Sequence, residues 1–344
     1  MSLIKICKLK THSKKMHTVA SNCLVAVTLA AASPIGFSQS VIDSYATKPM
    51  HILVPFPPGG TADVLARVIG QKITEATGQT VIVENRAGAG GTIGMEAARR
   101  SPADGYNFVL ISNTQAGSQV LYPKLPHDIT KDFTPISLIA SSPMMIAANP
   151  ALGIKTLSEV LTRAERDPGK LSYASCGVGT AHHLAMEKIK FDTRINMVHV
   201  SYRGCAPAVA DALAGHINLV IASSPLILPQ VASGKFVALA VTNNKRSTLA
   251  SDVPTVGESG VPALKSFSMD NWYGFMAPLG TPTEAIKKLD AEVRKIMANP
   301  VVIQRLALVG IEPKAGNAEQ LMMMLKSDLA QFKSVVDYAR ITVE

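Results

Sequence analysis

Short apolar runs alternate with longer amphipathic runs along most of this chain, and this alternation limits its fold more than any other feature. Residues 50–55, 80–84 and 106–112 have the composition of strands. Residues 61–76 and 93–100 lie between them and place apolar side chains on one helical face. The β-α-β-α-β order predicts a parallel sheet with crossover helices, and therefore an α/β protein.

The same pattern continues in a second region and then changes. Further strands are predicted at residues 144–148, 171–174, 196–199, 217–221 and 236–241, with helices at 156–166, 180–190, 206–214 and 225–231. Beyond residues 267–278 the chain is predicted to be wholly helical, at 283–298, 300–309 and 318–338.

Two lobes are expected because more than three hundred residues exceed what one core usually serves. We predict lobe 1 at residues 45–140 plus 267–344 and lobe 2 at 141–266, with the helical tail covering lobe 1. Ligands of open α/β sheets lie outside the carboxyl ends of the strands. The predicted site is therefore the cleft between the lobes.

The first residues have the features of a secretory signal. Five lysines and no acid precede an apolar run at residues 23–32, and Ser33, Pro34 and Gly36 follow it. About ten apolar residues are too few to span a bilayer. We predict that residues 1–38 are a signal peptide, cleaved between Ser38 and Gln39, and that the mature protein is soluble and periplasmic. An uncleaved anchor is the alternative, and Met16 is an alternative start.

Charge and cysteines narrow the classes of function. Removing five lysines and no acids lowers the formal net charge from +9 to +4, and no basic tract with interleaved aromatic residues is present. Nucleic-acid binding is therefore not expected. Beyond the signal the only cysteines are Cys176 and Cys205, without the spacing of a zinc site. In an oxidising compartment they could pair, provided their Cα atoms lie within about 7 Å.

The loop after the first strand contains Phe56, Gly59 and Gly60 and leads into a helix at Thr61. The glycines let backbone N–H groups approach a ligand, and a helix N-terminus attracts carboxylates. An ordinary βα turn is the alternative. Asp63 is expected to neutralise the first helical turn rather than to contact the ligand.

The loop after the second strand contains Asn85 and a glycine-rich stretch that includes Gly90 and Gly91. Such a loop can form an anion nest. The rival hypothesis is a dinucleotide site. Its spacing, GxGGxxG, departs from GxGxxG, and the next strand ends in Ile-Ser-Asn without the acid that a ribose would need.

A third loop runs from Ser175 through Gly177 to Thr180, a suitable N-cap, and continues into His182 and His183. Adjacent helical residues point about 100° apart, so the two histidines cannot easily bind one metal ion. We expect His183 to face the cleft and His182 to face solvent. Ser175 lacks the GxSxG elbow of a catalytic triad.

The fourth loop presents Tyr202 and Arg203 before a helix. Arginine can offer a fork of donors to a carboxylate, although a solvated surface position is an equal alternative. The single tryptophan, Trp272, is expected in core or hinge packing rather than against the ligand.

Five motifs in order, VPFPPGGTAD, VENRAGAGGTIG, SCGVGTAHHL, YRGCAPAVAD and NWYGFMAPLGTP, resemble those of the Bug-type (TctC-like) receptors of tripartite tricarboxylate transporters. The resemblance runs from about residue 45 to the C-terminus. It implies a two-lobed, type II-like periplasmic-binding-protein fold and capture of carboxylates, partly through ordered water and loop backbone. By this resemblance the ligand-facing positions are Phe56, Gly59, Gly60, Asn85, Gly90, Ser175, Thr180, His183 and Tyr202.

Six further positions complete the predicted ligand-binding set: Thr61, Asp63, Gly91, Gly177, Arg203 and Asn218. The chain departs from the family pattern in three places. Asn218 stands where an aspartate is usual, Cys176 and Cys205 replace small residues in two cleft loops, and residues 115–120 lack the usual histidine-bearing stretch.

The predicted function is a non-catalytic extracytoplasmic receptor that closes on a small carboxylate and delivers it to a membrane transporter. Its expected partners are the permease subunits of a tripartite tricarboxylate-type transporter or a sensor kinase. It is expected to be a monomer without cofactor or metal. The alternatives are a periplasmic sensor that feeds signalling and, more remotely, a secreted hydrolase or lyase.

Overall fold

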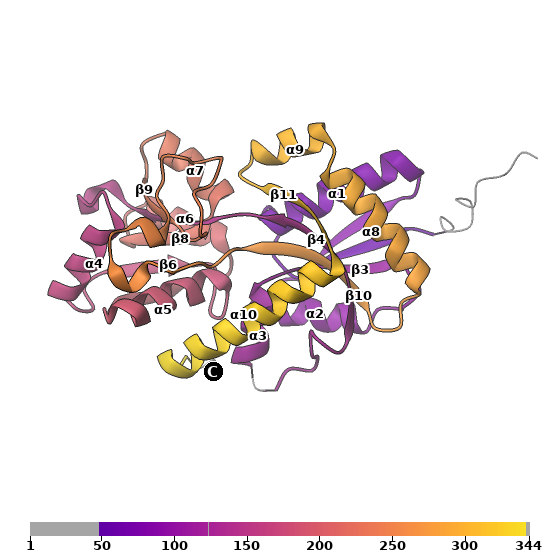
Figure 1. Ribbon diagram of the computed structural model, residues 1–344, viewed down its shortest axis with the longest axis horizontal. Coiled ribbons are helices and arrows are strands. Elements are labelled where there is room, and N and C mark those ends of the chain that lie inside the picture. The colour runs from indigo at the N-terminus through magenta and orange to yellow at the C-terminus, as the bar shows by residue number, and fades with distance from the viewer. Residues whose placement is uncertain (1–47, 123, 342–344) are drawn as a thin grey trace, which may run out of the picture. The chain divides into compact units, whose positions relative to one another are not determined.

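The computed structural model describes residues 48–122 and 124–341, which belong to one compact unit, Ser44–Glu344. The predicted signal peptide and its cleavage site lie outside the described residues. Within this unit the strands form two separate sheets, each with helices packed on it (Figure 1). The fold is thus α/β with two lobes, as the sequence predicts.

The first sheet has six strands in the order β11-β4-β10-β3-β1-β2. β1, β2 and β3 are parallel, and β10 and β11 run antiparallel to their neighbours. The bounds are β1 Met50–Val54, β2 Val81–Asn85, β3 Asn107–Ser112, β4 Phe133–Ser141, β10 Trp272–Pro278 and β11 Glu312–Asn317. The helices of this lobe are α1 Thr61–Thr77, α2 Thr92–Arg99, α3 Thr114–Leu121, α8 Thr283–Met297, α9 Pro300–Ala307 and α10 Ala318–Ala339.

The second sheet has five strands in the order β7-β6-β8-β5-β9. β6, β7 and β8 are parallel, and β5 pairs antiparallel with β8 and β9. The bounds are β5 Met144–Ala148, β6 Ser172–Ser175, β7 Val198–Ser201, β8 Leu219–Ser223 and β9 Val237–Val241. The helices are α4 Leu157–Arg166, α5 Ala181–Thr193, α6 Cys205–Leu213 and α7 Ser224–Ala232.

β1, β2 and β3 pair in parallel, as the β-α-β-α-β order predicts, but both complete sheets are mixed. The reason is the way the chain crosses between the lobes. β4 ends one lobe and β5 begins the other with only Ser142 and Pro143 between them, and β10 brings the chain back. A strand that starts at the cleft must run opposite to strands whose carboxyl ends meet there.

We propose the lobe bounds that the sequence predicts, with lobe 1 at residues 45–140 plus 267–344 and lobe 2 at residues 141–266.

The region beyond residues 267–278, predicted to be wholly helical, contains the strand β11, so the prediction was wrong there. β11 has the sequence EPKAGN, which carries no strand pattern. It pairs with β4 only near its two ends, with an irregularity between Pro313 and Gly316. Its extended form is therefore imposed by the neighbouring strand rather than by local propensity.

Helix α10 joins the two lobes. It contacts α3 and β4 of the first lobe, as predicted, and also α5 of the second lobe. Trp272 is 1% exposed, which confirms its core or hinge position, and its indole N–H donates to Asp328 on α10 at 2.7 Å. One continuous hydrophobic cluster includes Val109 of β3, Leu184 of α5 and Phe332 of α10.

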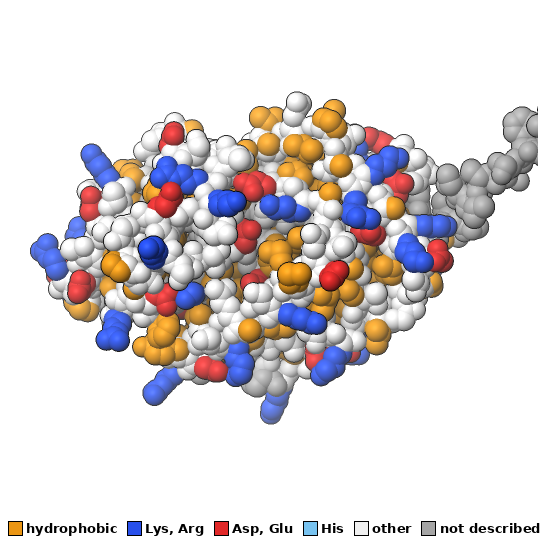
Figure 2. Space-filling view, viewed as in Figure 1, with side chains coloured by type: hydrophobic (Ala, Val, Ile, Leu, Met, Phe, Trp, Pro, Cys, Tyr) orange, Lys and Arg blue, Asp and Glu red, His pale blue; other side chains and the backbone are white. Residues whose placement is uncertain are grey.

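On the face shown in Figure 2, basic and acidic side chains are interspersed over the surface. Exposed local ion pairs occur among the described residues, such as Lys333 with Asp337 at 2.9 Å and Arg246 with Glu258 at 2.9 Å. Exposed pairs of this kind each contribute at most about 1 kcal/mol. Among the described residues, the helices all lack the combination of length and apolar character needed to cross a membrane.

Asp328, which accepts the hydrogen bond from Trp272, makes the stability of the protein depend on pH. Its burial raises its pKa to about 7, against the hydrogen bond from Trp272, and the charge of Asp270 raises the pKa further. The folded state thus holds this proton more tightly than the unfolded chain does. The stabilisation is fully present below the ordinary aspartate pKa of 3.8 and is lost as pH rises through about 7.

We expect Asp328→Asn to keep an acceptor for Trp272 and to remove this titration. The free energy of unfolding of the variant, relative to the natural protein, should therefore rise between about pH 4 and pH 8. Denaturant unfolding at a series of pH values measures this difference. A difference that is constant across that range would contradict the assignment to Asp328.

Candidate ligand-binding cleft

The carboxyl ends of the parallel strands in both sheets meet at a cleft of about 600 Å³. First-lobe residues from the loops after β1, β2 and β3 line it, and second-lobe residues from the loops after β6, β7 and β8 complete it. The sequence predicted this location from strand order. Ten members of the predicted ligand-binding set line the cleft: Phe56, Gly59, Gly60, Thr61, Gly90, Gly91, Gly177, Thr180, Tyr202 and Arg203.

The loop after β1 brings the N-terminus of α1 to the cleft. The first intrahelical bond runs from Val64 N–H to the Gly60 carbonyl, so the N–H groups of Thr61 and Ala62 precede the helical ladder. Gly60 is the N-cap and has no side chain to cap these groups. The open end of the helix is therefore available to an anion.

Asp63 and Asn85 hold this loop from behind and do not line the cleft. The Asp63 carboxylate accepts from Gly59 N–H at 2.9 Å and from Arg67, so the Gly59 N–H is not free for a ligand. Burial alone would raise the pKa of Asp63, but these hydrogen bonds hold it below its ordinary value. Asn85 donates to the Phe56 carbonyl at 3.2 Å. Both positions therefore support the loop.

The loop after β2 requires its glycines. Gly90 and Gly91 have φ angles of +62° and +90°. A Cβ on Gly90 would lie 2.6 Å from Ser118 Oγ, and one on Gly91 would lie 2.5 Å from Gln115 Nε2. Ser118 Oγ also donates to the Gly90 carbonyl at 2.8 Å. Residues 115–120, where the sequence departs from the family pattern, thus form α3 and support this loop.

The loop after β6 ends at the N-terminus of α5. Thr180 is the N-cap: its Oγ1 accepts from His183 N–H at 3.4 Å and donates to the Gly177 carbonyl at 2.8 Å. This confirms the predicted cap. The start of α5 therefore faces the cleft from the lobe opposite to α1.

The two adjacent histidines point the other way from the prediction. His182 lines the cleft, with Nε2 3.3 Å from Ser223 Oγ. His183 is 4% exposed and points into the lobe, where its Nδ1 accepts from Gly179 N–H at 3.2 Å. The bond to Gly179 closes the loop onto the first turn of α5, so His183 positions the loop. Burial lowers the pKa of His182 to about 4, so this imidazole is neutral at neutral pH.

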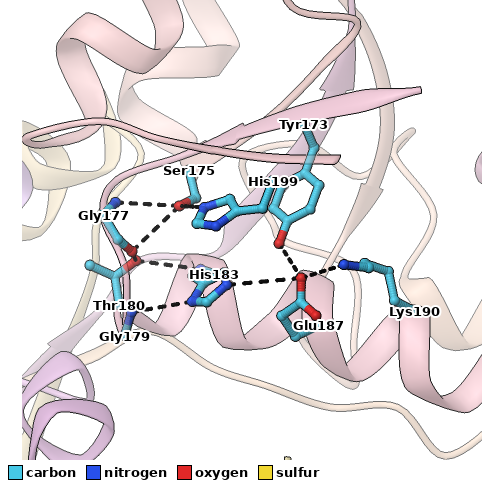
Figure 3. A network of polar contacts seen from close by, with 9 residues as sticks. All are labelled: Tyr173, Ser175, Gly177, Gly179, Thr180, His183, Glu187, Lys190 and His199. Atoms are coloured by element: carbon cyan, nitrogen blue, oxygen red, sulfur yellow. Dashed lines mark hydrogen bonds and ion pairs between the residues drawn. The ribbon is translucent and has the colours of Figure 1, made fainter. Parts of the chain in front are cut away.

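A buried polar network lies behind this loop (Figure 3). The His183 and His199 rings stack at 4.0 Å, and Ser175 Oγ is 2.7 Å from His199 Nε2. Glu187 accepts from Tyr173 at 2.6 Å and from Lys190 at 2.7 Å. Ser175 is fully buried in this network and does not line the cleft. Its place in the fold corrects the expectation that it faces the ligand.

The floor of the cleft is a chain of side chains that sequence reasoning did not select. Asn271 Nδ2 donates to Tyr273 Oη at 2.8 Å and to Ser223 Oγ at 3.3 Å. Tyr273 also hydrogen-bonds with Thr61. Asn271 and Tyr273 flank Trp272, and alternate residues of a strand share a face. That alternation within the NWYGF motif is the signal that could have found them.

Asn218 does not reach the cleft. Its Oδ1 accepts from Ser172 N–H at 2.9 Å, beside the first residues of β6 and β8. Ligands meet the carboxyl ends of these strands, and Asn218 precedes them. The substitution of asparagine for the usual aspartate therefore bears on strand pairing and not on ligand contact, which corrects the prediction.

Cys176 and Cys205 form a disulfide, with their Cα atoms 4.2 Å apart. The bond ties the loop after β6 to the start of α6, and both cysteines line the cleft. Gly204 N–H also donates to the Cys176 carbonyl at 3.1 Å. The second-lobe wall is therefore cross-linked at the point where the ligand would meet it.

Thiol titration of the denatured, unreduced protein tests this cross-link. We expect no reaction from Cys176 and Cys205, with both thiols appearing after reduction. Two free thiols before reduction would reject the bridge. Intact mass of the alkylated protein gives the same result independently, because each free thiol adds one alkyl group.

The electrostatics of the cleft favour an anion. Of the described residues that line it, Arg203 alone is charged, and it is exposed. Aspartate and glutamate are missing from that described lining. The N-termini of α1, α5 and α6 meet the cleft and supply partial positive charge. The site can stabilise negative charge and has no group to neutralise a cation.

Two lobes with a cleft between them whose lining favours an anion are typical of a solute-binding protein. Residues 65–340 match the family model described as tripartite tricarboxylate transporter family receptor (TctC). The chain therefore belongs to this family of periplasmic solute-binding receptors. The family assignment from the sequence motifs is confirmed.

Similar proteins agree with this assignment. The protein BugT of Bordetella pertussis is 33% identical over 86% of this chain and 90% of its own length. An R. palustris protein with adipate is 30% identical with a TM-score of 0.81, covering 87% of this chain and 99% of that one. MatC from Rhodopseudomonas palustris with bound malate is 27% identical with a TM-score of 0.77, covering 85% and 100%.

Proposed function

We propose that this protein is a periplasmic receptor for a small carboxylate that carries no positively charged group. The observation that carries the proposal is the cleft wall: helix N-termini from both lobes meet it, and no acid lines it among the described residues. Backbone N–H groups at helix ends bind carboxylates well, whereas an ammonium group would need an acidic partner. The relatives with adipate and with malate bind such anions.

The carboxylate would lie against the open end of α1, with Thr61 and Ala62 N–H as donors. Gly90 and Gly91 would shape the wall beside it. Thr180, Gly177 and Tyr202 would close on the solute from the second lobe, and Arg203 at the rim would attract it before closure. Asn85, Asp63, His183 and Ser175 would act indirectly, because they hold these loops.

A catalytic role has weak support. The Ser175–His199 pair has the spacing of an activated nucleophile, but Ser175 is fully buried away from the cleft. A nucleophile must reach the substrate, and this hydroxyl faces the interior of the lobe. We therefore propose binding without turnover, followed by delivery to the membrane subunits of a tripartite tricarboxylate-type transporter. Export would follow from the predicted signal at residues 1–38.

Two substitutions of Gly60 can distinguish an effect of charge on ligand binding from an effect on the folding of α1. Gly60 has φ −82° and ψ 172°, ordinary values for an N-cap, and a Cβ there would meet nothing closer than 3.8 Å. Aspartate and asparagine are both preferred N-caps, so neither should destabilise α1. Only Gly60→Asp places a negative charge where the carboxylate would bind. We expect it to weaken carboxylate binding at least about tenfold more than Gly60→Asn, or roughly 1.4 kcal/mol.

Calorimetric titration with the identified solute measures both variants. Lys326→Glu, an exposed change on α10, makes a larger change of charge far from the cleft and should alter affinity less than about threefold, because distant charges are screened. Equal losses of affinity in Gly60→Asp and Gly60→Asn would contradict binding of the carboxylate at the N-terminus of α1.

The solute itself can be identified by mass spectrometry of the ligand released from purified periplasmic protein. We expect a small carboxylic acid without an amino group. An amino acid or a cationic solute recovered in stoichiometric amount would contradict the assignment.

A further inference from the structure

We propose that Cys176, Cys205 and His182 form a binding site for a thiophilic divalent cation once their disulfide is reduced, with Zn²⁺ as the ion that fits. The ligand atoms of these three residues, two sulfurs and one ring nitrogen, all lie within 4.8 Å of one another. They come from three positions on the second-lobe wall, and all three line the cleft. This inference does not depend on which solute the receptor carries.

The distances suit a tetrahedral ion. With Zn–S near 2.3 Å and Zn–N near 2.0–2.1 Å, the sulfurs would lie about 3.8 Å apart and each about 3.6 Å from the nitrogen. Cys205 Sγ is now 4.0 Å from His182 Nε2. Breaking the disulfide frees the two sulfurs to separate by side-chain rotation, so only small movements are required.

The surroundings of His182 allow its ring to bind an ion. Nε2 makes two long contacts, 3.3 Å to Ser223 Oγ and 4.0 Å to Cys205 Sγ. If the ring turned toward the ion, Ser223 would keep its hydrogen bond from Asn271. Two thiolates would neutralise the divalent charge, which matters because His182 is 6% exposed and an unpaired charge would be costly there.

Two thiolates and one imidazole leave the fourth zinc position open. Since the three residues line the cleft, that position faces the space that the solute would occupy. A water molecule or a solute carboxylate oxygen could fill it. The site would therefore add a direct link between the second-lobe wall and an anionic ligand.

Reduction of the Cys176–Cys205 disulfide makes both sulfurs available as ligands. A dithiol donates two electrons and two protons to the Cys176–Cys205 bond, the S–S bond breaks, and the dithiol becomes its own disulfide. Each cysteine sulfur then carries one proton. Binding of Zn²⁺ releases these two protons to water as the sulfurs become thiolates. In the oxidised protein the two sulfurs are bonded to each other and cannot bind the cation as thiolates.

Zinc titration of the full mature protein, oxidised and reduced, tests the proposal. The protein is reduced with a dithiol, separated from it without oxygen, and titrated with Zn²⁺ against a chromogenic chelator. We expect one Zn²⁺ per reduced chain and at least about hundredfold weaker binding, or roughly 2.7 kcal/mol, by the oxidised chain. Co²⁺ in place of Zn²⁺ should give the visible absorption of a tetrahedral thiolate complex.

His182→Ala should weaken binding by the reduced protein at least about tenfold, because one of three ligands is lost. His216→Ala is the matched control: this exposed histidine pairs with Asp211 on α6 and should leave the affinity unchanged. His182→Gln, which keeps a polar side chain, serves if His182→Ala fails to fold. Equal zinc binding by oxidised and reduced protein, no stoichiometric binding after reduction, or unchanged affinity in both His182 variants would overturn the site.

Discussion

The hydrogen bonds of Asn271 hold the site together, because this amide joins the two lobes at the floor of the cleft. Asn271 Nδ2 reaches Tyr273 of the first sheet and Ser223 of the second, and all three side chains are buried. Leaving one of these polar groups without a partner would cost about 1–3 kcal/mol. The loops that carry the helix N-termini are arranged around this floor. The placement of these loops relative to one another, and therefore the shape of the proposed anion-binding site, depends on the hydrogen bonds of Asn271.

Most of the fold could be predicted from the sequence because the elements follow local patterns. The strand at 144–148 and the helix starting at Thr61 were placed at their observed positions, and the cleft followed from strand order. The strands β4, β10 and β11 were missed for a physical reason. They are stabilised by pairing with each other, and β11 in particular has no strand pattern of its own.

The glycines of the predicted ligand-binding set line the cleft, whereas several of its predicted side chains do not. Gly60, Gly90 and Gly91 could be found because glycine-rich loops between strand and helix have a specific use. The predicted orientations of His182 and His183 were reversed, because a helical sequence gives the angle between adjacent side chains but not which of the two faces the cleft. The sequence allowed Cys176 and Cys205 to pair, but it did not show that His182 lies beside them, because that proximity depends on how the fold orients the start of α5.

In the receptor that we propose, backbone N–H groups bind the ligand, and charged side chains lie behind the loops or at the exposed edge of the cleft. A crystal structure of the protein with its solute bound would test this most directly. We predict that the carboxylate oxygens accept hydrogen bonds from the N–H groups of Thr61 and Ala62, with Thr180 closing from the opposite lobe. A carboxylate paired with the Arg203 guanidinium, away from the start of α1, would contradict this account.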